Sequence, residues 1–159
     1  MTKDHKFMGL AYARAQFSKD TSTKVGAIIV GPAGEDRASG YNGAPRGCSA
    51  DEAGDPRRDQ RPEKYFWFSH AELNAITNAA RVGVPLEGCT IFVTHPPCMD
   101  CARAIVQAGI KRVVTVEQGA DFYERWKEHI LRSRRLFHEC GVEFEVLDAN
   151  DDQLSVRDT

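Results

Sequence analysis

The sequence has no long apolar run and no excess of positive charge. No stretch approaches the roughly 18 consecutive apolar residues of a membrane-spanning helix, and the opening hexapeptide MTKDHK lacks the apolar core of a signal peptide. The 21 Lys and Arg are balanced by 23 Asp and Glu, so the net charge at pH 7 is -2. A nucleic-acid surface needs surplus Lys and Arg to neutralise phosphates. The composition therefore argues against a membrane protein and against a nucleic-acid partner, while a local basic pocket for one nucleotide stays compatible with it.

Cysteine is scarce, because the 159 residues include only five, an odd number that does not suit a disulfide framework. Two of them, Cys98 and Cys101, belong to a motif described below. The other three are expected to be free thiols in a reducing cytosol, namely Cys48, Cys89 and Cys140. We therefore expect a cytoplasmic protein. Internal repeats and interdomain linkers are also absent, which predicts one domain over residues 1–149 and a polar tail over residues 150–159.

Helical and strand-like patterns alternate along the chain, which predicts an α/β sandwich. Helices are expected at residues 7–17, 70–81, 98–108 and 123–140. Buried strands are expected at residues 25–30, 37–41, 89–94, 112–116 and 142–147. The first helix is expected to bury a stripe that includes Leu10 and Phe17, and the last to turn Cys140 inward. The polar stretch 42–62 is expected to be a long loop, which in a small domain is usually functional or disordered.

Two short motifs carry the chemistry of this chain. They are His70-Ala71-Glu72 and Pro97-Cys98-Met99-Asp100-Cys101. The imidazole and the two thiols supply three zinc ligands, and a catalytic zinc site uses three protein ligands and keeps a fourth position for water. Each motif opens a predicted helix, where the partial positive charge of the helix N-terminus favours thiolates. The pattern H-x-E…P-C-x-x-C is the signature of zinc-dependent nucleobase deaminases.

The residue types suit hydrolytic deamination, which replaces an exocyclic amine on an aromatic ring with oxygen. Neutral water is a poor nucleophile, and zinc lowers the pKa of bound water from about 15.7 to roughly 7. A carboxylate must then carry protons from water to the ring nitrogen and to the departing amine. Glu72 is the only acidic residue of the His-x-Glu motif, so we predict that it is the general acid and base.

Three other interpretations of these motifs stay open. The Cys-x-x-Cys pair alone is also typical of a redox site in an intracellular protein. A structural zinc site would want a fourth protein ligand, for which His95 and Cys89 are the nearby candidates. A zinc-stabilised binding protein without activity is the non-enzymatic alternative. Glu72 argues against that alternative, because a structural site has no use for the carboxylate.

Further stretches give the chain a family resemblance. They are Ser18-Lys19-Asp20 through Lys24-Val25-Gly26-Ala27, then Gly40-Tyr41-Asn42-Gly43-Ala44-Pro45-Arg46-Gly47, and His70-Ala71-Glu72-Leu73-Asn74-Ala75-Ile76. With the zinc motif, they make the chain resemble the deoxycytidylate deaminases of the cytidine deaminase superfamily over about residues 7–147. The zinc motif is specific to the superfamily, and the Tyr-Asn-Gly-x-Pro-Arg-Gly loop narrows the resemblance toward nucleotide deaminases.

The resemblance implies a hydrolase that converts dCMP and water to dUMP and ammonia, inside a three-layer α/β/α fold around a five-stranded mixed sheet. It assigns zinc to His70, Cys98 and Cys101, and proton shuttling to Glu72. It also implies a homo-oligomer, with dCTP and dTTP as possible effectors. Three substrate contacts are expected: the side chain of Asn42 with the nucleoside, the backbone of Ala71 with the pyrimidine edge, and Arg46 with the phosphate.

Several substrates remain compatible with the sequence. CMP, 5-substituted dCMP, other cytosine nucleotides or nucleosides, free cytosine and guanine are alternatives to dCMP. A tRNA adenosine deaminase shares the zinc motif, although the net charge and the loop at residues 41–47 count against it. Residues 49–68 depart from the family pattern, so the sequence assigns no role to that stretch.

Overall fold

The computed structural model describes residues 1–150, which are built around a five-stranded sheet with strand order β2-β1-β3-β4-β5. The strands are β1 (Gly26–Val30), β2 (Asp36–Tyr41), β3 (Thr90–Val93), β4 (Arg112–Val116) and β5 (Glu143–Leu147). Strand β1 runs antiparallel to both β2 and β3, whereas β3, β4 and β5 are parallel. The predicted mixed sheet of five strands is therefore confirmed.

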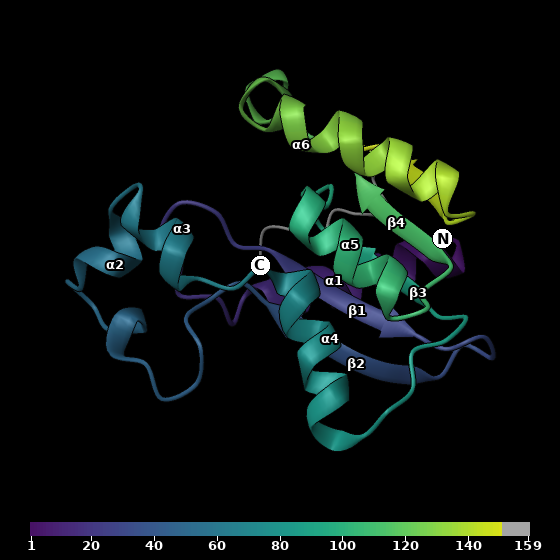
Figure 1. The fold of residues 1–159 in the computed structure, drawn as a ribbon, viewed down its shortest axis with the longest axis horizontal. Coiled ribbons are helices and arrows are strands. Elements are labelled where there is room, and N and C mark those ends of the chain that lie inside the picture. The colour runs from purple at the N-terminus through teal and green to yellow at the C-terminus, as the bar shows by residue number, and fades with distance from the viewer. Residues whose placement is uncertain (151–159) are drawn as a thin grey trace.

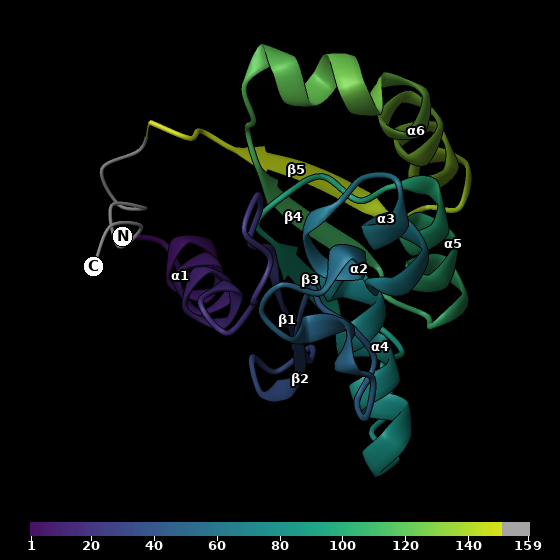
Figure 2. The same cartoon turned by 90° about the vertical axis from the view of Figure 1, so that its left-hand side faces the viewer.

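Helices cover both faces of this sheet. The long helices are α1 (Lys3–Ala15), α4 (Ala71–Val82), α5 (Met99–Gln107) and α6 (Ala120–Glu139). Figure 2 shows α1 on one side of the sheet and the other three on the opposite side, so the expected three layers are present. Parallel strands connected by helices are buried on both faces, and the apolar residues of β1, β3 and β4 fit that arrangement.

The apolar residues of each strand separate into two cores because side chains alternate between the faces of a sheet. Ile29 and Ile91 point to the α4–α5–α6 side, where they join a core that also contains Phe137. Ile28 and Phe92 point to the other side and pack beneath α1. The first core lies directly behind the N-termini of α4 and α5, so it fixes the two helix ends on which the predicted metal ligands stand.

Gly40 lets α4 lie directly on the sheet. A Cβ atom at this position would come within 2.4 Å of the backbone nitrogen of Ala75 and 2.5 Å of the carbonyl oxygen of Ala71. These distances are far shorter than a van der Waals contact, so any side chain would push the helix away from β2. The helix that begins at the His-x-Glu motif thus owes its position to a glycine.

Two sequence-based predictions about buried positions are wrong. Leu10 and Phe17 are 47% and 61% exposed, and the face of α1 that meets the sheet is shifted by about one position. The buried positions of that helix are His5, Met8, Ala11 and Ala15. Cys140 is exposed because α6 ends at Glu139, and the cysteine follows as its C-cap rather than continuing the buried stripe.

The predicted loop at residues 42–62 contains short helical segments. A 3₁₀ turn, η1 (Ser49–Asp51), is followed by α2 (Pro56–Asp59) and α3 (Glu63–Trp67). Figure 1 shows α2 and α3 projecting together beyond one end of the sheet. Within residues 1–150, no helix has the length and apolar character that crossing a membrane requires. Of the predicted polar tail, residues 151–159 lie outside the described residues.

Candidate active site

The imidazole of His70 and the thiols of Cys98 and Cys101 meet where two helices begin. His70 is the N-cap of α4 and Cys98 is the N-cap of α5. Nδ1 of His70 lies 3.4 Å from Sγ of Cys98 and 3.6 Å from Sγ of Cys101. All three ligand atoms lie within 4.8 Å of one another. The predicted meeting of the two motif halves at two helix N-termini is therefore what the structure shows.

Backbone contacts hold the segment that carries His70. Gly43 and the neighbouring Ser69 form an isolated antiparallel bridge, with N–H···O distances of 3.1 and 2.8 Å. The side-chain amide of Asn74 donates to the carbonyl oxygen of Tyr41 at 2.7 Å, which ties the first turn of α4 to the same loop. The Tyr41–Gly47 loop thus positions a metal-ligand candidate in addition to any contact with substrate.

A residue of α6 positions the Pro-Cys-x-x-Cys motif. The backbone N–H of Met99, the first residue of α5, donates to Nδ1 of His129 at 3.2 Å. A helix leaves its first N–H groups without partners inside the helix, and this imidazole satisfies one of them. The contact fixes the start of α5 between Cys98 and Cys101.

The protonation of the cluster fits a cation site. A hydrogen bond with Cys98 raises the pKa of His70 to about 9, against the opposing effect of burial. Hydrogen bonds from Cys101 and His70 lower the pKa of the Cys98 thiol, while the hydrogen bond to Cys98 and burial raise that of Cys101. Without a metal ion, protons must balance the negative sulfur atoms. A soft divalent cation with two thiolates and one imidazole as ligands would replace those protons, which is a donor set that zinc favours.

The fourth protein ligand of a structural site is not present in the cluster. Among residues 1–150, the ligand atoms that gather within 4.8 Å are those of His70, Cys98 and Cys101, and neither Cys89 nor His95 belongs to the group. Three protein ligands with an open position are the arrangement of a catalytic zinc site.

Glu72 lies in the first turn of α4 and is only 4% exposed. Burial raises the pKa of its carboxyl to about 7, partly offset by the attraction of the His70 charge. A carboxyl with a pKa near neutrality can both accept and donate a proton at that pH, which is what a general acid and base must do. The residue lines the same pocket as His70 and Cys98.

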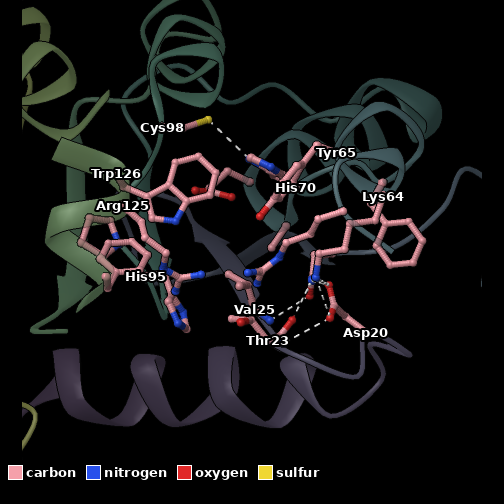
Figure 3. A pocket seen from close by; sticks show the side chains of 17 residues that line it. Asp20, Thr23, Val25, Lys64, Tyr65, His70, His95, Cys98, Arg125 and Trp126 are labelled. Atoms are coloured by element: carbon pink, nitrogen blue, oxygen red, sulfur yellow. Dashed lines mark hydrogen bonds and ion pairs between the residues drawn. The ribbon is translucent and has the colours of Figure 1, made fainter. Parts of the chain in front are cut away.

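The walls of this pocket are largely aromatic. The ring of Trp126 on α6 stands edge-on to the rings of His70 and Tyr65, with centroid distances of 6.3 and 6.4 Å. Phe122, one turn earlier on α6, lies 6.4 Å from Trp126 and 5.5 Å from His95. Figure 3 shows Trp126 of α6 and His70 at the start of α4 facing the same space. A flat aromatic ligand fits between such walls.

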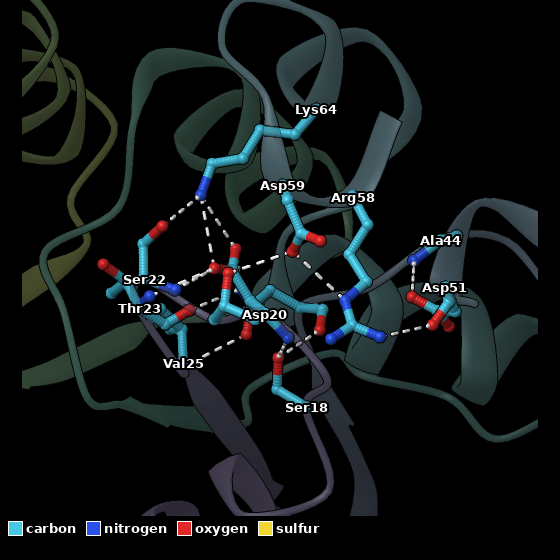
Figure 4. A network of polar contacts seen from close by, with 12 residues as sticks. Ser18, Asp20, Ser22, Thr23, Val25, Ala44, Asp51, Arg58, Asp59 and Lys64 are labelled. Carbon is cyan, nitrogen blue, oxygen red and sulfur yellow. Dashed lines mark hydrogen bonds and ion pairs between the residues drawn. The ribbon is translucent and has the colours of Figure 1, made fainter. Parts of the chain in front are cut away.

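A polar network closes the opposite side of the pocket. The amide of Asn42 accepts from the N–H of Val25 at 2.8 Å and donates to the carbonyl oxygen of Thr23 at 2.9 Å. It also donates to Asp20 at 3.3 Å, and Asp20 forms an ion pair with Lys64. Figure 4 shows Asp20, Thr23 and Lys64 close together at the loop that precedes β1.

The family described as "Cytidine and deoxycytidylate deaminase zinc-binding region" matches residues 1–117, which include both motif halves. The chain belongs to this deaminase family. It is 44% identical over 138 residues to an uncharacterized deaminase of Aliivibrio fischeri, covering 87% of this chain and 88% of the relative. It is 40% identical over 140 residues to human deoxycytidylate deaminase, with coverages of 87% and 75%.

Solved structures agree with this placement of the deaminase. The dCMP deaminase of the cyanophage S-TIM5, in complex with dCMP and dUMP, superposes with a TM-score of 0.72 at 31% identity and covers 92% of this chain and 99% of the phage chain. A tRNA:A34 deaminase superposes with a TM-score of 0.52 at 23% identity over 92% of this chain and all of that chain, which shows a shared fold.

The structure of this deaminase brings most of the predicted site residues together. Ala71 and Asn42 line the pocket beside the metal-ligand candidates. Arg46 does not line it; its guanidinium donates to the side chain of Asn78 on α4 at 2.7 Å. The predicted phosphate contact of Arg46 therefore stays a prediction, without support from its position.

Sequence reasoning missed the part of the pocket that α6 provides. Arg125 and Trp126 lie three and four residues after Phe122 on α6, which places all three on one face. Such a stripe in an amphipathic helix usually indicates a core face rather than a binding site. The sequence feature that could have indicated a ligand-binding face is the presence of Arg125 among the aromatic residues of this helix face. Lys64 and Tyr65 were missed because residues 49–68 matched no pattern.

Proposed function

We propose that this protein is a deoxycytidylate deaminase, which hydrolyses dCMP to dUMP and ammonia. The observation that carries the proposal is the meeting of His70, Cys98 and Cys101 beside a buried carboxyl, Glu72, at the bottom of an aromatic pocket. The relatives support the choice of substrate, since several are deoxycytidylate deaminases and the phage structure was solved with dCMP and dUMP.

In the proposed site, His70 and the thiolates of Cys98 and Cys101 would hold the zinc ion. When bound, zinc supplies the Lewis acidity that makes water a usable nucleophile at neutral pH. The helix N-termini of α4 and α5 help these residues hold the ion, because their partial positive charges keep the thiols ionised.

Glu72 moves the protons of the reaction. Its carboxylate takes a proton from the attacking water and delivers it to the ring nitrogen next to the carbon under attack. It then takes the second proton from the hydroxyl group now on the ring carbon and gives it to the amine, which leaves as ammonia while the carbonyl forms. Each transfer needs a group whose pKa lies near the working pH. Burial against the apolar pocket supplies that pKa, and the place of Glu72 in the first turn of α4 brings it to the reacting atoms.

The remaining pocket residues bind and orient the nucleotide. Trp126 and Phe122 form an apolar wall for the pyrimidine ring and exclude water from it. The backbone of Ala71 contacts the pyrimidine edge. Asn42 contacts the nucleoside through its amide oxygen, which has a second lone pair after accepting from Val25, whereas both amide hydrogens are already donated.

The wider setting of the enzyme is proposed on the family resemblance. The protein works in the cytoplasm as a homo-oligomer, residues 1–149 act as one catalytic domain, and dCTP and dTTP are possible effectors. These points need measurements of oligomeric state and of effector response.

The substrate proposal is tested by ammonia release from a panel that contains dCMP, CMP, 5-methyl-dCMP, deoxycytidine, cytosine and a tRNA anticodon stem-loop in one buffer. The expected result is the highest kcat/KM for dCMP. Preference for deoxycytidine would reassign the protein as a nucleoside deaminase. Turnover of the stem-loop alone would favour the tRNA-editing alternative, and no turnover of any substrate would favour a zinc-stabilised binding protein.

A further inference from the structure

Two arginines at the pocket have no charged or hydrogen-bonding partner among the described residues. Arg61 lies between α2 and α3, and Arg125 lies on α6. The Arg61 guanidinium lies over the ring of Tyr65, 5.8 Å from its centroid. Other arginines of the same region are engaged, since Arg57 and Arg58 both bond to acidic residues. Two unpaired guanidiniums therefore converge on one pocket from elements about sixty residues apart in the sequence.

The third cation of the pocket is already neutralised. Lys64 donates to both carboxylate oxygens of Asp20, at 3.2 and 3.1 Å, and to the hydroxyl of Ser22 at 3.3 Å. An ammonium group has three donors, so none is left for a ligand. The surplus positive charge at the pocket thus comes from Arg61 and Arg125.

The charged groups of the pocket lie at different depths. His70 is half-buried and Glu72 and Cys98 are buried, whereas Arg61 and Arg125 are exposed at its mouth. Figure 3 shows Arg125 beside Trp126 and His95, with Cys98 on the far side of the indole. A nucleotide whose pyrimidine ring enters toward Glu72 leaves its phosphate at the mouth, where these guanidiniums stand.

We propose that Arg61 and Arg125 form a phosphate-binding pair that holds the 5′-phosphate of the nucleotide and makes the enzyme select nucleotides over nucleosides. This inference rests on the proposed function, because it uses the orientation of a pyrimidine nucleotide in the deaminase pocket. A guanidinium presents its N–H donors in a planar fork that matches phosphate oxygens. The two guanidinium groups come from different elements that line the pocket, so the pair also fixes the direction in which the nucleotide lies.

Arg61 and Arg125 are positioned by different parts of the fold. Arg61 stands three residues before Lys64, whose ion pair with Asp20 anchors α3 to the loop that precedes β1. Arg125 stands beside Trp126, whose ring contacts His70. The sequence assigned no role to the segment at residues 49–68. In this proposal, the segment carries a specificity-determining arginine to the pocket.

The test uses the variants Arg61→Gln and Arg125→Gln, with Arg135→Gln as the matched control. Arg135 lies on α6, is 81% exposed, pairs with Glu139 and does not line the pocket. Charge-assisted hydrogen bonds have net strengths that correspond to about 10- to 100-fold in affinity. We expect kcat/KM for dCMP to fall by about 10- to 100-fold in each pocket variant, mainly through KM, while kcat/KM for deoxycytidine stays within about twofold. Arg61→Lys and Arg125→Lys should recover only part of the loss, because an ammonium cannot form the bidentate contact.

Product binding gives a second measurement that does not depend on turnover. Calorimetry with the zinc-loaded protein should show dUMP binding about 10- to 100-fold weaker in each pocket variant, with deoxyuridine binding and the Arg135→Gln control unchanged. Equal losses for dUMP and deoxyuridine, or wild-type protein that binds both equally, would overturn the phosphate-binding pair. A phosphate-selective loss in Arg46→Gln alone would assign the phosphate to the Tyr41–Gly47 loop instead. If wild-type protein turns over no cytosine nucleotide, the proposed function fails, and the binding comparison still decides whether the two arginines select phosphate.

Discussion

Lys64 and Asp20 form an ion pair that is almost completely buried. Nζ of Lys64 lies 3.1 Å from Oδ2 of Asp20, and the two side chains are 7% and 5% exposed. The same carboxylate accepts from the backbone N–H groups of Ser22 and Thr23 at 2.8 and 3.1 Å. Figure 4 shows the pair at the centre of a network between α3 and the loop before β1. The ion pair therefore connects the segment that contains α2 and α3 to the loop that precedes β1.

Replacing Lys64 with Met should strongly destabilise the protein. Removing one partner of a buried pair leaves the other charge without compensation, which typically costs about 3–5 kcal/mol. The free energy of unfolding, measured with urea, should fall by that amount. The exposed pair of Arg135 and Glu139 provides the control, since Arg135→Gln should cost less than about 1 kcal/mol. A loss for Lys64→Met no larger than for the control would contradict the importance of the buried pair.

Wild-type protein should hold about one zinc ion per chain, in line with a single three-ligand site. Cys98→Ser and Cys101→Ser should lose the metal, because a serine hydroxyl is a poor zinc ligand. Cys140→Ser should keep it, since Cys140 is exposed and outside the cluster. Metal content by atomic absorption and activity after chelation check this. Zinc-free protein with full turnover would rule out the proposed role of the cluster.

Glu72→Gln should keep the zinc and the fold but lose turnover. The amide has the shape of the carboxyl and cannot shuttle protons, and general acid–base catalysis typically contributes about 10²–10⁴-fold. Unfolding free energy should not fall, because the buried carboxyl gains little from its surroundings. Single-turnover rates and metal content should be measured together. A decrease below about tenfold, or loss of zinc, would exclude proton transfer as the main role of Glu72.

The strands and the meeting of the three metal-ligand candidates could be predicted from the sequence because both depend on short-range patterns. The run at residues 112–116 is apolar enough to specify β4, and the spacing of Cys98 and Cys101 specifies a shared ligand face at the start of a helix. The wall of the pocket depends on contacts between distant elements. Nothing local in Trp126 indicates that α6 lies across from His70, and nothing in Lys64 indicates that its partner is Asp20. Such pairings follow from the packing of the complete sheet.

Asn42→Ala should reduce stability as well as substrate binding. Sequence reasoning gave this residue a contact with the nucleoside, whereas the structure also commits its amide to Val25, Thr23 and Asp20. Losing it leaves the N–H of Val25 and the carbonyl of Thr23 unpaired in a largely buried place, at about 1–3 kcal/mol. Urea unfolding tests the structural part. KM for dCMP, measured where the variant is fully folded, tests the contact: an unchanged KM would restrict Asn42 to positioning the loop.

Gly40→Ala should disturb the metal centre from a distance. The new Cβ would lie 2.4–2.5 Å from backbone atoms of Ala75 and Ala71, so α4 must move away from β2. Overpacking of this kind typically costs about 1–3 kcal/mol, and the shift carries His70 at the N-terminus of α4 away from the two cysteines. Zinc affinity, measured by chelator competition, should therefore decrease together with stability. Gly9→Ala is the matched control: Gly9 lies within α1, where a Cβ meets nothing within 4 Å, and alanine should stabilise the helix by about 0.5–1 kcal/mol without affecting zinc. If Gly40→Ala lowers stability while zinc affinity stays at the wild-type value, the close approach of α4 to β2 supports the fold and leaves the metal ligands where they are.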